Sequence, residues 1–153
     1  MKTEQKRILI FDEDYERMRD FKEYLEEEFG WFVELTAQKE IPHRLQTETF
    51  DLILIDSMIH LTSFDADNNE VENVHFDDVN WQKTGLEFAK RLRGGEFSSA
   101  EGKGTSPLVP VIILSAVANY SIKPDLENMG FLYQEKPFLL DEMTEQIKTL
   151  LKV

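Results

Sequence analysis

Residues 51–58 read Asp-Leu-Ile-Leu-Ile-Asp-Ser-Met, and this stretch decides the fold. Four branched aliphatic residues in a row, beginning at Leu52, are typical of a strand that is buried on both faces of a parallel sheet. The run stops at Asp56, so a carboxylate is expected at the C-terminal end of a central strand. In open α/β sheets, ligands bind beyond that edge.

A second apolar run ends in the same way. Residues 8–11 read Ile-Leu-Ile-Phe, and the acids Asp12, Glu13 and Asp14 follow directly. We interpret Asp14 as the N-cap of the next helix. Taken singly, Asp12 and Asp56 could equally be helix caps. If the two strands are parallel neighbours, however, Asp12, Glu13 and Asp56 converge and repel one another. A hard cation such as Mg²⁺ offsets that repulsion.

The whole sequence alternates strand and helix patterns. Strands are expected at 6–11, 31–36, 51–56, 109–114 and 131–135. Helices are expected at 15–29, around Ile41 and Leu45, at 82–93, within 119–129 and at 140–151. This alternation predicts βαβ units with right-handed crossovers. At this length we expect one α/β domain over residues 1–153, a flavodoxin-like, doubly wound, five-stranded parallel sheet with strand order 2-1-3-4-5.

Residues 61–81 interrupt the pattern after the third strand. They contain six acids, no Lys or Arg, and scattered apolar residues from Phe64 to Trp81. A long loop inside a compact domain is usually functional or disordered. A solvated acidic loop is the favoured interpretation, and a lid, a docking element or a source of metal ligands are the alternatives.

Composition excludes several classes of function. With no Cys among 153 residues, the chain has no disulfide, thiolate metal site or Cys nucleophile. The three His residues show no metal-ligand spacing. A net charge of −13 disfavours direct binding to nucleic acid or to an anionic membrane. The polar N-terminus does not resemble a signal peptide, and no apolar run approaches the ~20 residues of a membrane span. We therefore expect a cytoplasmic protein.

Distinctive polar residues follow four of the five expected strands. They are Asp12 and Glu13, then Asp56, then Ser115, and finally Lys136. In a doubly wound sheet these strand ends share one edge, and their side chains suit phosphoryl transfer. Asp56 would be the nucleophile, and Asp12 and Glu13 would hold Mg²⁺. Lys136 and Ser115 would bind the remaining phosphoryl oxygens.

On these residues the sequence resembles the response-regulator receiver domains of two-component signalling, over essentially the whole chain except the insertion and the loop before the fourth strand. The resemblance rests on four segments in order, at residues 8–13, 51–58, 115–116 and 136–138. It implies that Asp56 is the phosphoacceptor for a sensor histidine kinase or a phosphotransfer protein. The backbone carbonyl of Met58 would be a further Mg²⁺ ligand, beside Asp12, Glu13 and Asp56.

The resemblance also implies a switch and a backbone geometry. On phosphorylation, Ser115 would move toward the phosphoryl group and Tyr133 would turn inward, a repacking biased by a local change of charge. The Lys136-Pro137 peptide bond is expected to be cis, which is accessible at modest energy only before proline.

Two features depart from the family pattern. His60 stands where the family usually has Pro, and the matching Gly85 comes about twenty residues late. The acidic insertion is therefore expected to lower access to Asp56 or to alter Mg²⁺ affinity. Met58 and Val117 occupy the positions that tune self-dephosphorylation in the family, and both are apolar. Neither can position a water by hydrogen bonding, so a persistent phosphorylated state is expected.

The leading hypothesis is a stand-alone receiver and not an enzyme, because the chain ends with the fifth helix. Its output would pass through an unidentified protein partner, on the face of the fourth helix, fifth strand and fifth helix; homodimer formation stays open. The alternative is a phosphorylation-independent, receiver-like interaction module. A phosphohydrolase would need a second Asp where Met58 stands. Flavin binding would need a phosphate-binding loop where Asp12, Glu13 and Asp14 stand.

Overall fold

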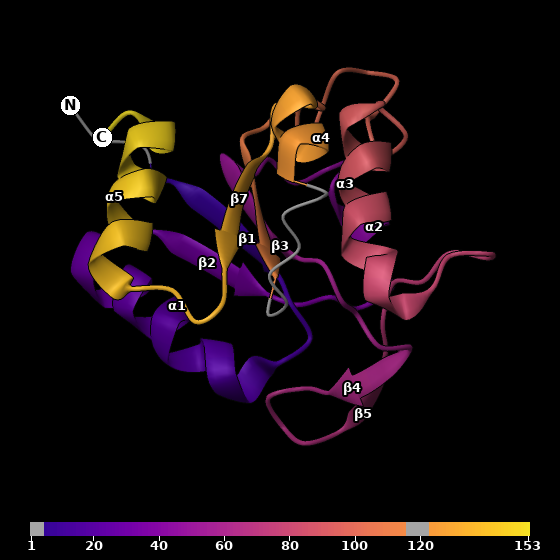
Figure 1. Ribbon diagram of the computed structural model, residues 1–153, viewed down its shortest axis with the longest axis horizontal. Coiled ribbons are helices and arrows are strands. Elements are labelled where there is room, and N and C mark those ends of the chain that lie inside the picture. Colours follow the sequence, from indigo (N-terminus) through magenta and orange to yellow (C-terminus); the bar gives the residue numbers. More distant parts are fainter. Residues whose placement is uncertain (1–4, 116–122) are drawn as a thin grey trace.

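The predicted alternation of strands and helices is present in the computed structural model, which describes residues 5–115 and 123–153 (Figure 1). The elements are β1 (Arg7–Phe11), α1 (Tyr15–Phe29), β2 (Phe32–Leu35), α2 (Ile41–Arg44), β3 (Leu52–Asp56), β4 (Thr62–Phe64), β5 (Glu70–Glu72), the 3₁₀ helix η1 (Trp81–Lys83), α3 (Thr84–Arg93), β6 (Val111–Ser115), α4 (Lys123–Asn128), β7 (Leu132–Glu135) and α5 (Leu140–Leu151).

Five of the strands form one parallel sheet in the order β2-β1-β3-β6-β7. This confirms the predicted flavodoxin-like order 2-1-3-4-5, because β6 and β7 are the fourth and fifth strands of the sheet. The segment 51–58 supplies its central strand: β3 pairs with β1 on one side and with β6 on the other.

Helices cover both faces of the sheet: α1 and α5 lie on one face, and α2, α3 and α4 on the other (Figure 1). Alternate residues of each central strand serve the two cores. Ile8 and Ile10 of β1 pack toward α1 and α5, whereas Leu9 and Phe11 pack toward α2 and α3. Each such buried side chain stabilises the fold by about 1.5–3 kcal/mol. The continuous apolar runs in the sequence follow directly from this two-sided burial.

Helix α1 begins and ends where the sequence predicts. The Asp14 side chain accepts a hydrogen bond from the Arg17 amide (3.2 Å), which is the N-cap interaction. At the other end Gly30 has φ = +67°, a left-handed conformation that glycine adopts without steric penalty.

The described part of helix α4 runs from Lys123 to Asn128 and includes Pro124. The earlier part of the range predicted for this helix, at 119–122, lies outside the described residues. Among the helices that the structure describes, none has the length and apolar character of a membrane span.

The acidic insertion is more ordered than the predicted solvated loop. Strands β4 and β5 form an antiparallel hairpin whose acids are largely exposed. The segment after β5 returns to the body of the protein: Asn73 and Val74 are buried, and the Val74 amide donates to the Ala37 carbonyl (2.8 Å). Val74 also joins the α2/α3 core. The scattered apolar residues of the insertion therefore include anchors for the hairpin, while most of its acids are exposed to solvent, as the favoured interpretation expects.

Candidate functional site

Two carboxylates lie side by side at the C-terminal ends of adjacent strands. Asp12 directly follows β1, and Asp56 is the last residue of β3. The pairing of Phe11 with Ile55 brings both to the same edge of the sheet. Asp12 is only 2% exposed, so one of the two acids is almost completely removed from water.

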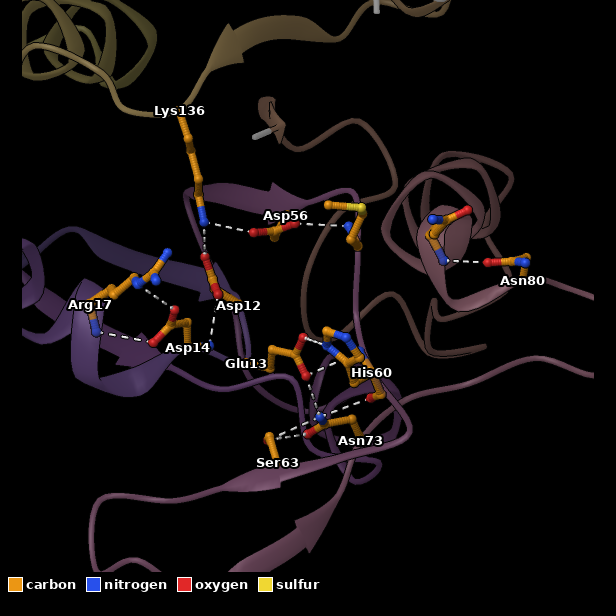
Figure 2. Close-up of polar contacts among 12 residues, drawn as sticks. Asp12, Glu13, Asp14, Arg17, Asp56, His60, Ser63, Asn73, Asn80 and Lys136 are labelled. Carbon is orange, nitrogen blue, oxygen red and sulfur yellow. Dashed lines mark hydrogen bonds and ion pairs between the residues drawn. The ribbon is translucent and has the colours of Figure 1, made fainter. Parts of the chain in front are cut away.

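Lys136 reaches across the sheet from β7 and joins these carboxylates. Its Nζ lies 2.6 Å from Asp12 Oδ2 and 2.6 Å from Asp56 Oδ2 (Figure 2). The Lys136-Pro137 peptide is cis, as the resemblance implies. Residues separated by up to 124 positions in the sequence thus form one compact charged group.

Burial shapes the protonation of this group. It raises the pKa of Asp12 to about 6; Lys136 opposes that rise and the negative charge of Asp56 adds to it. Burial also disfavours the charged form of Lys136, but Asp12 and Asp56 outweigh it and raise the pKa of the ammonium group. Lys136 is therefore cationic at neutral pH.

Backbone amides fix the remaining carboxylate oxygens. The Met58 amide donates to Asp56 Oδ1 (2.8 Å), and the Asp14 amide donates to Asp12 Oδ1 (2.8 Å). Each acid therefore has one oxygen held by the backbone and the other directed at Lys136. This leaves the Asp56 side chain with little freedom to rotate.

The first turn of α3 packs directly on the backbone of the central strand's end. The Gly85 amide donates to the Ser57 carbonyl (3.0 Å). A β-carbon at Gly85 would lie 2.7 Å from the Asp56 carbonyl carbon and 2.8 Å from Ser57 Cα. The insertion separates Gly85 from Asp56 by about twenty more residues than the family pattern has. The chain nevertheless returns to the end of β3 after the insertion, so Gly85 packs against Asp56.

Glu13, the third predicted metal ligand, is held by His60 and by Asn73 of the insertion. Its Oε2 accepts from the His60 amide (3.0 Å) and from Asn73 Nδ2 (3.3 Å), and its Oε1 contacts His60 Nδ1. Figure 2 shows the Glu13 carboxylate beside His60, while Asp12 and Asp56 meet at Lys136. The structure thus brings Asp12, Asp56 and Lys136 together and gives Glu13 different partners.

The other predicted residues are close in the fold. Ser115 is buried at the end of β6, and its carbonyl accepts from the Lys136 amide (2.8 Å). Tyr133 is half-buried on β7 and packs against the α2/α3 core. Val117 lies outside the described residues. The switch roles of Ser115 and Tyr133 stay predictions.

A cleft of about 900 Å³ opens over the charged group. Asp12, Asp56, Met58 and Lys136 border it on one side. The rest of the lining combines apolar side chains, including Met18, Phe21 and Phe138, with polar ones such as Glu13 and His60. A phosphorylated ligand or protein side chain can therefore approach Asp56 from solvent.

The donor set fits Mg²⁺ in part. Asp12 and Asp56 supply carboxylate oxygens beside the same cleft, and Met58 also borders it. Within residues 5–115 and 123–153, no three Asp, Glu or His side chains are grouped as metal ligands would be. Glu13 could join Asp12 and Asp56 only by leaving His60 and Asn73.

Sequence patterns did not identify the partners of Glu13. His60 looked like an ordinary loop residue, although its ring stacks on Trp81 with centroids 4.3 Å apart. No motif or periodicity in the sequence marks Asn73 as a buried residue. Asn73 is a neutral amide directly before the apolar Val74 in an otherwise acidic segment, and this pattern is only a weak indication of a buried contact.

Comparison with known proteins identifies the fold. No protein-family model matches the sequence, and no curated protein sequence matches it. Solved structures match over nearly the whole chain. The receiver domain of the Francisella response regulator 1452 is 24% identical, with a TM-score of 0.66 over 97% of this chain and 98% of that one.

Two further structures show the same similarity. A two-component response regulator from Clostridium difficile is 18% identical, with a TM-score of 0.68 and 97% of each chain covered. A Burkholderia pseudomallei response regulator, solved with a phosphorylated aspartic acid, a calcium ion and citrate, is 16% identical, with a TM-score of 0.62 over 97% of this chain and 69% of that one. These matches show that the chain has the fold of a response-regulator receiver domain.

Proposed function

We propose that this chain, which has the receiver-domain fold, is a phosphoacceptor of a two-component phosphorelay and forms one receiver domain over residues 1–153. Asp56 accepts a phosphoryl group from a sensor histidine kinase or a phosphotransfer protein. Phosphorylation then switches binding to a protein partner. The observation that carries the proposal is the group of Asp12, Asp56 and Lys136, held within 2.6 Å contacts at the mouth of an open cleft.

The residues of this group divide the chemistry between them. A carboxylate oxygen of Asp56 attacks the phosphorus of the donor, the new P–O bond replaces the P–N bond of phosphohistidine, and the histidine nitrogen takes up a proton. The Met58 amide, 2.8 Å from Asp56 Oδ1, fixes the orientation of the nucleophile. Lys136 carries its positive charge to the point where phosphoryl oxygens arrive.

Mg²⁺ is the proposed cofactor, with Asp12, Asp56 and the Met58 carbonyl as oxygen ligands and Glu13 as a further ligand. When bound, the ion neutralises charge on the phosphoryl oxygens. Two observations support a cation here: two carboxylates share the cleft, and the Burkholderia structure combines a phosphorylated aspartic acid with calcium. After transfer, Ser115 and Tyr133 are the proposed switch residues.

Phosphorylation is tested by intact mass after incubation with acetyl phosphate and Mg²⁺. One phosphoryl adduct is expected for the wild type, and none for Asp56→Asn or in the presence of EDTA. Asp20→Asn is the matched control, because Asp20 is an exposed acid beside the same cleft. An adduct that persists in Asp56→Asn, or that forms equally well in EDTA, would contradict the proposal.

The phosphorylated state is expected to be long-lived, because Met58 is apolar and borders the cleft beside Asp56. It cannot hold a water for attack on the phosphoryl group. Met58→Asn supplies an amide that can do so, and is expected to speed hydrolysis roughly tenfold, which corresponds to about 1.4 kcal/mol of barrier. The loss of adduct from both proteins is followed over time by mass. Rapid loss from the wild type without a phosphatase would contradict this expectation.

The main competing function is a phosphorylation-independent interaction module, and one observation favours it: Glu13 is engaged by His60 and Asn73. The complete set of Asp12, Asp56, Ser115 and Lys136 favours phosphorylation instead. We further propose that the chain is not an enzyme acting on a separate substrate, since Met58 stands where a phosphohydrolase would need its second acid. The kinase and the output partner stay unidentified.

A further inference from the structure

Neighbouring acids of the β1–α1 connection face different parts of the protein. Asp12 contacts Lys136, which also contacts Asp56, whereas Glu13 has two interactions with His60, just before the insertion, and one with Asn73 within it (Figure 2). The Glu13 side chain is 13% exposed, so it is well enclosed by these partners. Glu13 directly follows Asp12 in the sequence, but its hydrogen bonds go to His60 and Asn73 and not to Lys136.

Asn73 is the anchored member of this arrangement. It is 1% exposed, and its Nδ2 lies within hydrogen-bonding distance of three oxygens: Glu13 Oε2 (3.3 Å), the His60 carbonyl (3.0 Å) and Ser63 Oγ (3.0 Å). Its own amide donates to the Leu61 carbonyl (2.9 Å). These bonds tie Asn73, which follows β5, to residues 60–63 at the start of the hairpin, so Asn73 cannot follow Glu13 if that side chain moves.

Hydrogen bonds to a carboxylate stabilise the conformation in which they form. A cation that takes a Glu13 oxygen as a ligand must compete with the donors at His60 and Asn73. These donors and the cation favour different positions of one side chain. Cation binding and the hydrogen bonds of Glu13 are then opposed, and each weakens the other by the same free energy.

We propose that Glu13, His60 and Asn73 form a latch that holds Glu13 away from Asp12 and Asp56, with Asn73 as its positioning residue. Mg²⁺ gains Glu13 as a ligand only when the latch opens, so Mg²⁺ occupancy at the phosphorylation site is coupled to the conformation of the insertion. This inference rests on the proposed function, because it concerns the same site.

The stacked pair of His60 and Trp81 provides a direct reporter of the latch. The ring centroids lie 4.3 Å apart, and the backbone amide and ring of His60 both contact Glu13. Release of Glu13 changes the surroundings of His60 and therefore of the indole. The chain has two Trp residues, so Trp31→Phe leaves Trp81 as the sole tryptophan. Phenylalanine is a conservative replacement because Trp31 stacks on the ring of Phe29.

The test is a Mg²⁺ titration of the full chain in the Trp31→Phe background, by calorimetry and by Trp81 fluorescence. Asn73→Leu removes the donor to Glu13 at similar volume. It is expected to bind Mg²⁺ roughly tenfold more tightly, the equivalent of one charge-assisted hydrogen bond. Trp81 emission is expected to respond to Mg²⁺ with Asn73 present, and to reach half of its change at a lower Mg²⁺ concentration in Asn73→Leu, because one of the contacts that hold Glu13 is already lost.

Asn80→Leu is the matched control, since Asn80 lies in the same insertion and its side chain accepts from the Gln82 amide (2.8 Å). It is expected to bind Mg²⁺ with the affinity of the background protein. If Asn73→Leu does not fold by circular dichroism, Asn73→Ser replaces it, because the shorter hydroxyl cannot reach Glu13.

Unchanged affinity in the folded Asn73 variant would overturn the latch. Weaker binding would also overturn it, because Asn73 would then be placing Glu13 for the metal. A protein with native Asn73 that neither binds Mg²⁺ nor forms a phosphoryl adduct would defeat the proposed function itself. One that does both, while the Asn73 variant binds identically, would defeat only the latch.

Discussion

Replacing Gly85 with alanine is expected to lower the free energy of unfolding by about 3 kcal/mol or more. An added β-carbon would lie 2.7 Å from the Asp56 carbonyl carbon and 2.8 Å from Ser57 Cα. Both neighbours are backbone atoms, at the last residue of β3 and the residue after it, so no flexible side chain can move aside. The structure can only separate α3 from β3, which also breaks the hydrogen bond from Gly85 to Ser57.

Urea unfolding of Gly85→Ala and wild type measures this effect. Gly94→Ala is the matched control, since Gly94 ends the same helix with φ = −76° and the nearest atom to an added β-carbon there is 3.4 Å away. We expect Gly94→Ala to change stability little. Equal stability of the Gly85 variant and the wild type would show that α3 does not pack on Asp56 as described.

Asp12→Asn is expected to stabilise the protein near neutral pH. Burial raises the pKa of Asp12 from 3.8 to about 6. Below 3.8 the carboxyl is protonated in both states. Between 3.8 and 6 the folded state binds a proton that the unfolded state lacks, so the free energy of unfolding falls as the pH rises. The whole rise of the Asp12 pKa corresponds to a loss of roughly 3 kcal/mol in the free energy of unfolding above pH 6.

Asparagine carries no such charge, so the stability difference between Asp12→Asn and wild type is expected to increase by about 2–3 kcal/mol from pH 4 to pH 7. Denaturant unfolding of both proteins across this pH range measures the difference. Asp20→Asn, at an exposed acid of α1, is expected to show little change of this kind. A difference that stays constant with pH would mean that ionised Asp12 is not held at a penalty.

Most of the fold could be predicted because its signals are local. The continuous apolar runs at 8–11 and 52–55 mark strands buried on both faces, and the structure places these two side by side in the sheet. Asp14 and Gly30 mark the ends of α1 by their capping chemistry. The alternation of elements then leaves few topologies, and the common strand order is the one observed.

The charged group could be predicted for a geometric reason. Asp12, Asp56 and Lys136 are each tied to the end of a strand, and parallel strands bring those ends to one edge. The sequence could not reveal the hydrogen bonds of Glu13. They depend on where the insertion folds, and that depends on long-range contacts such as Val74 with Ala37. Alternation of strands and helices carries no information about them.

The central claim is that Asp56 is the phosphoacceptor, and locating the adduct on the chain tests it most directly. The protein is treated with acetyl phosphate and Mg²⁺ and reduced with borohydride, which converts an aspartyl phosphate into homoserine. Peptide mass mapping then finds the altered residue. Homoserine at position 56 alone is the predicted result. Homoserine at position 12 or elsewhere, with Asp56 unaltered, would contradict the assignment of Asp56 as the nucleophile.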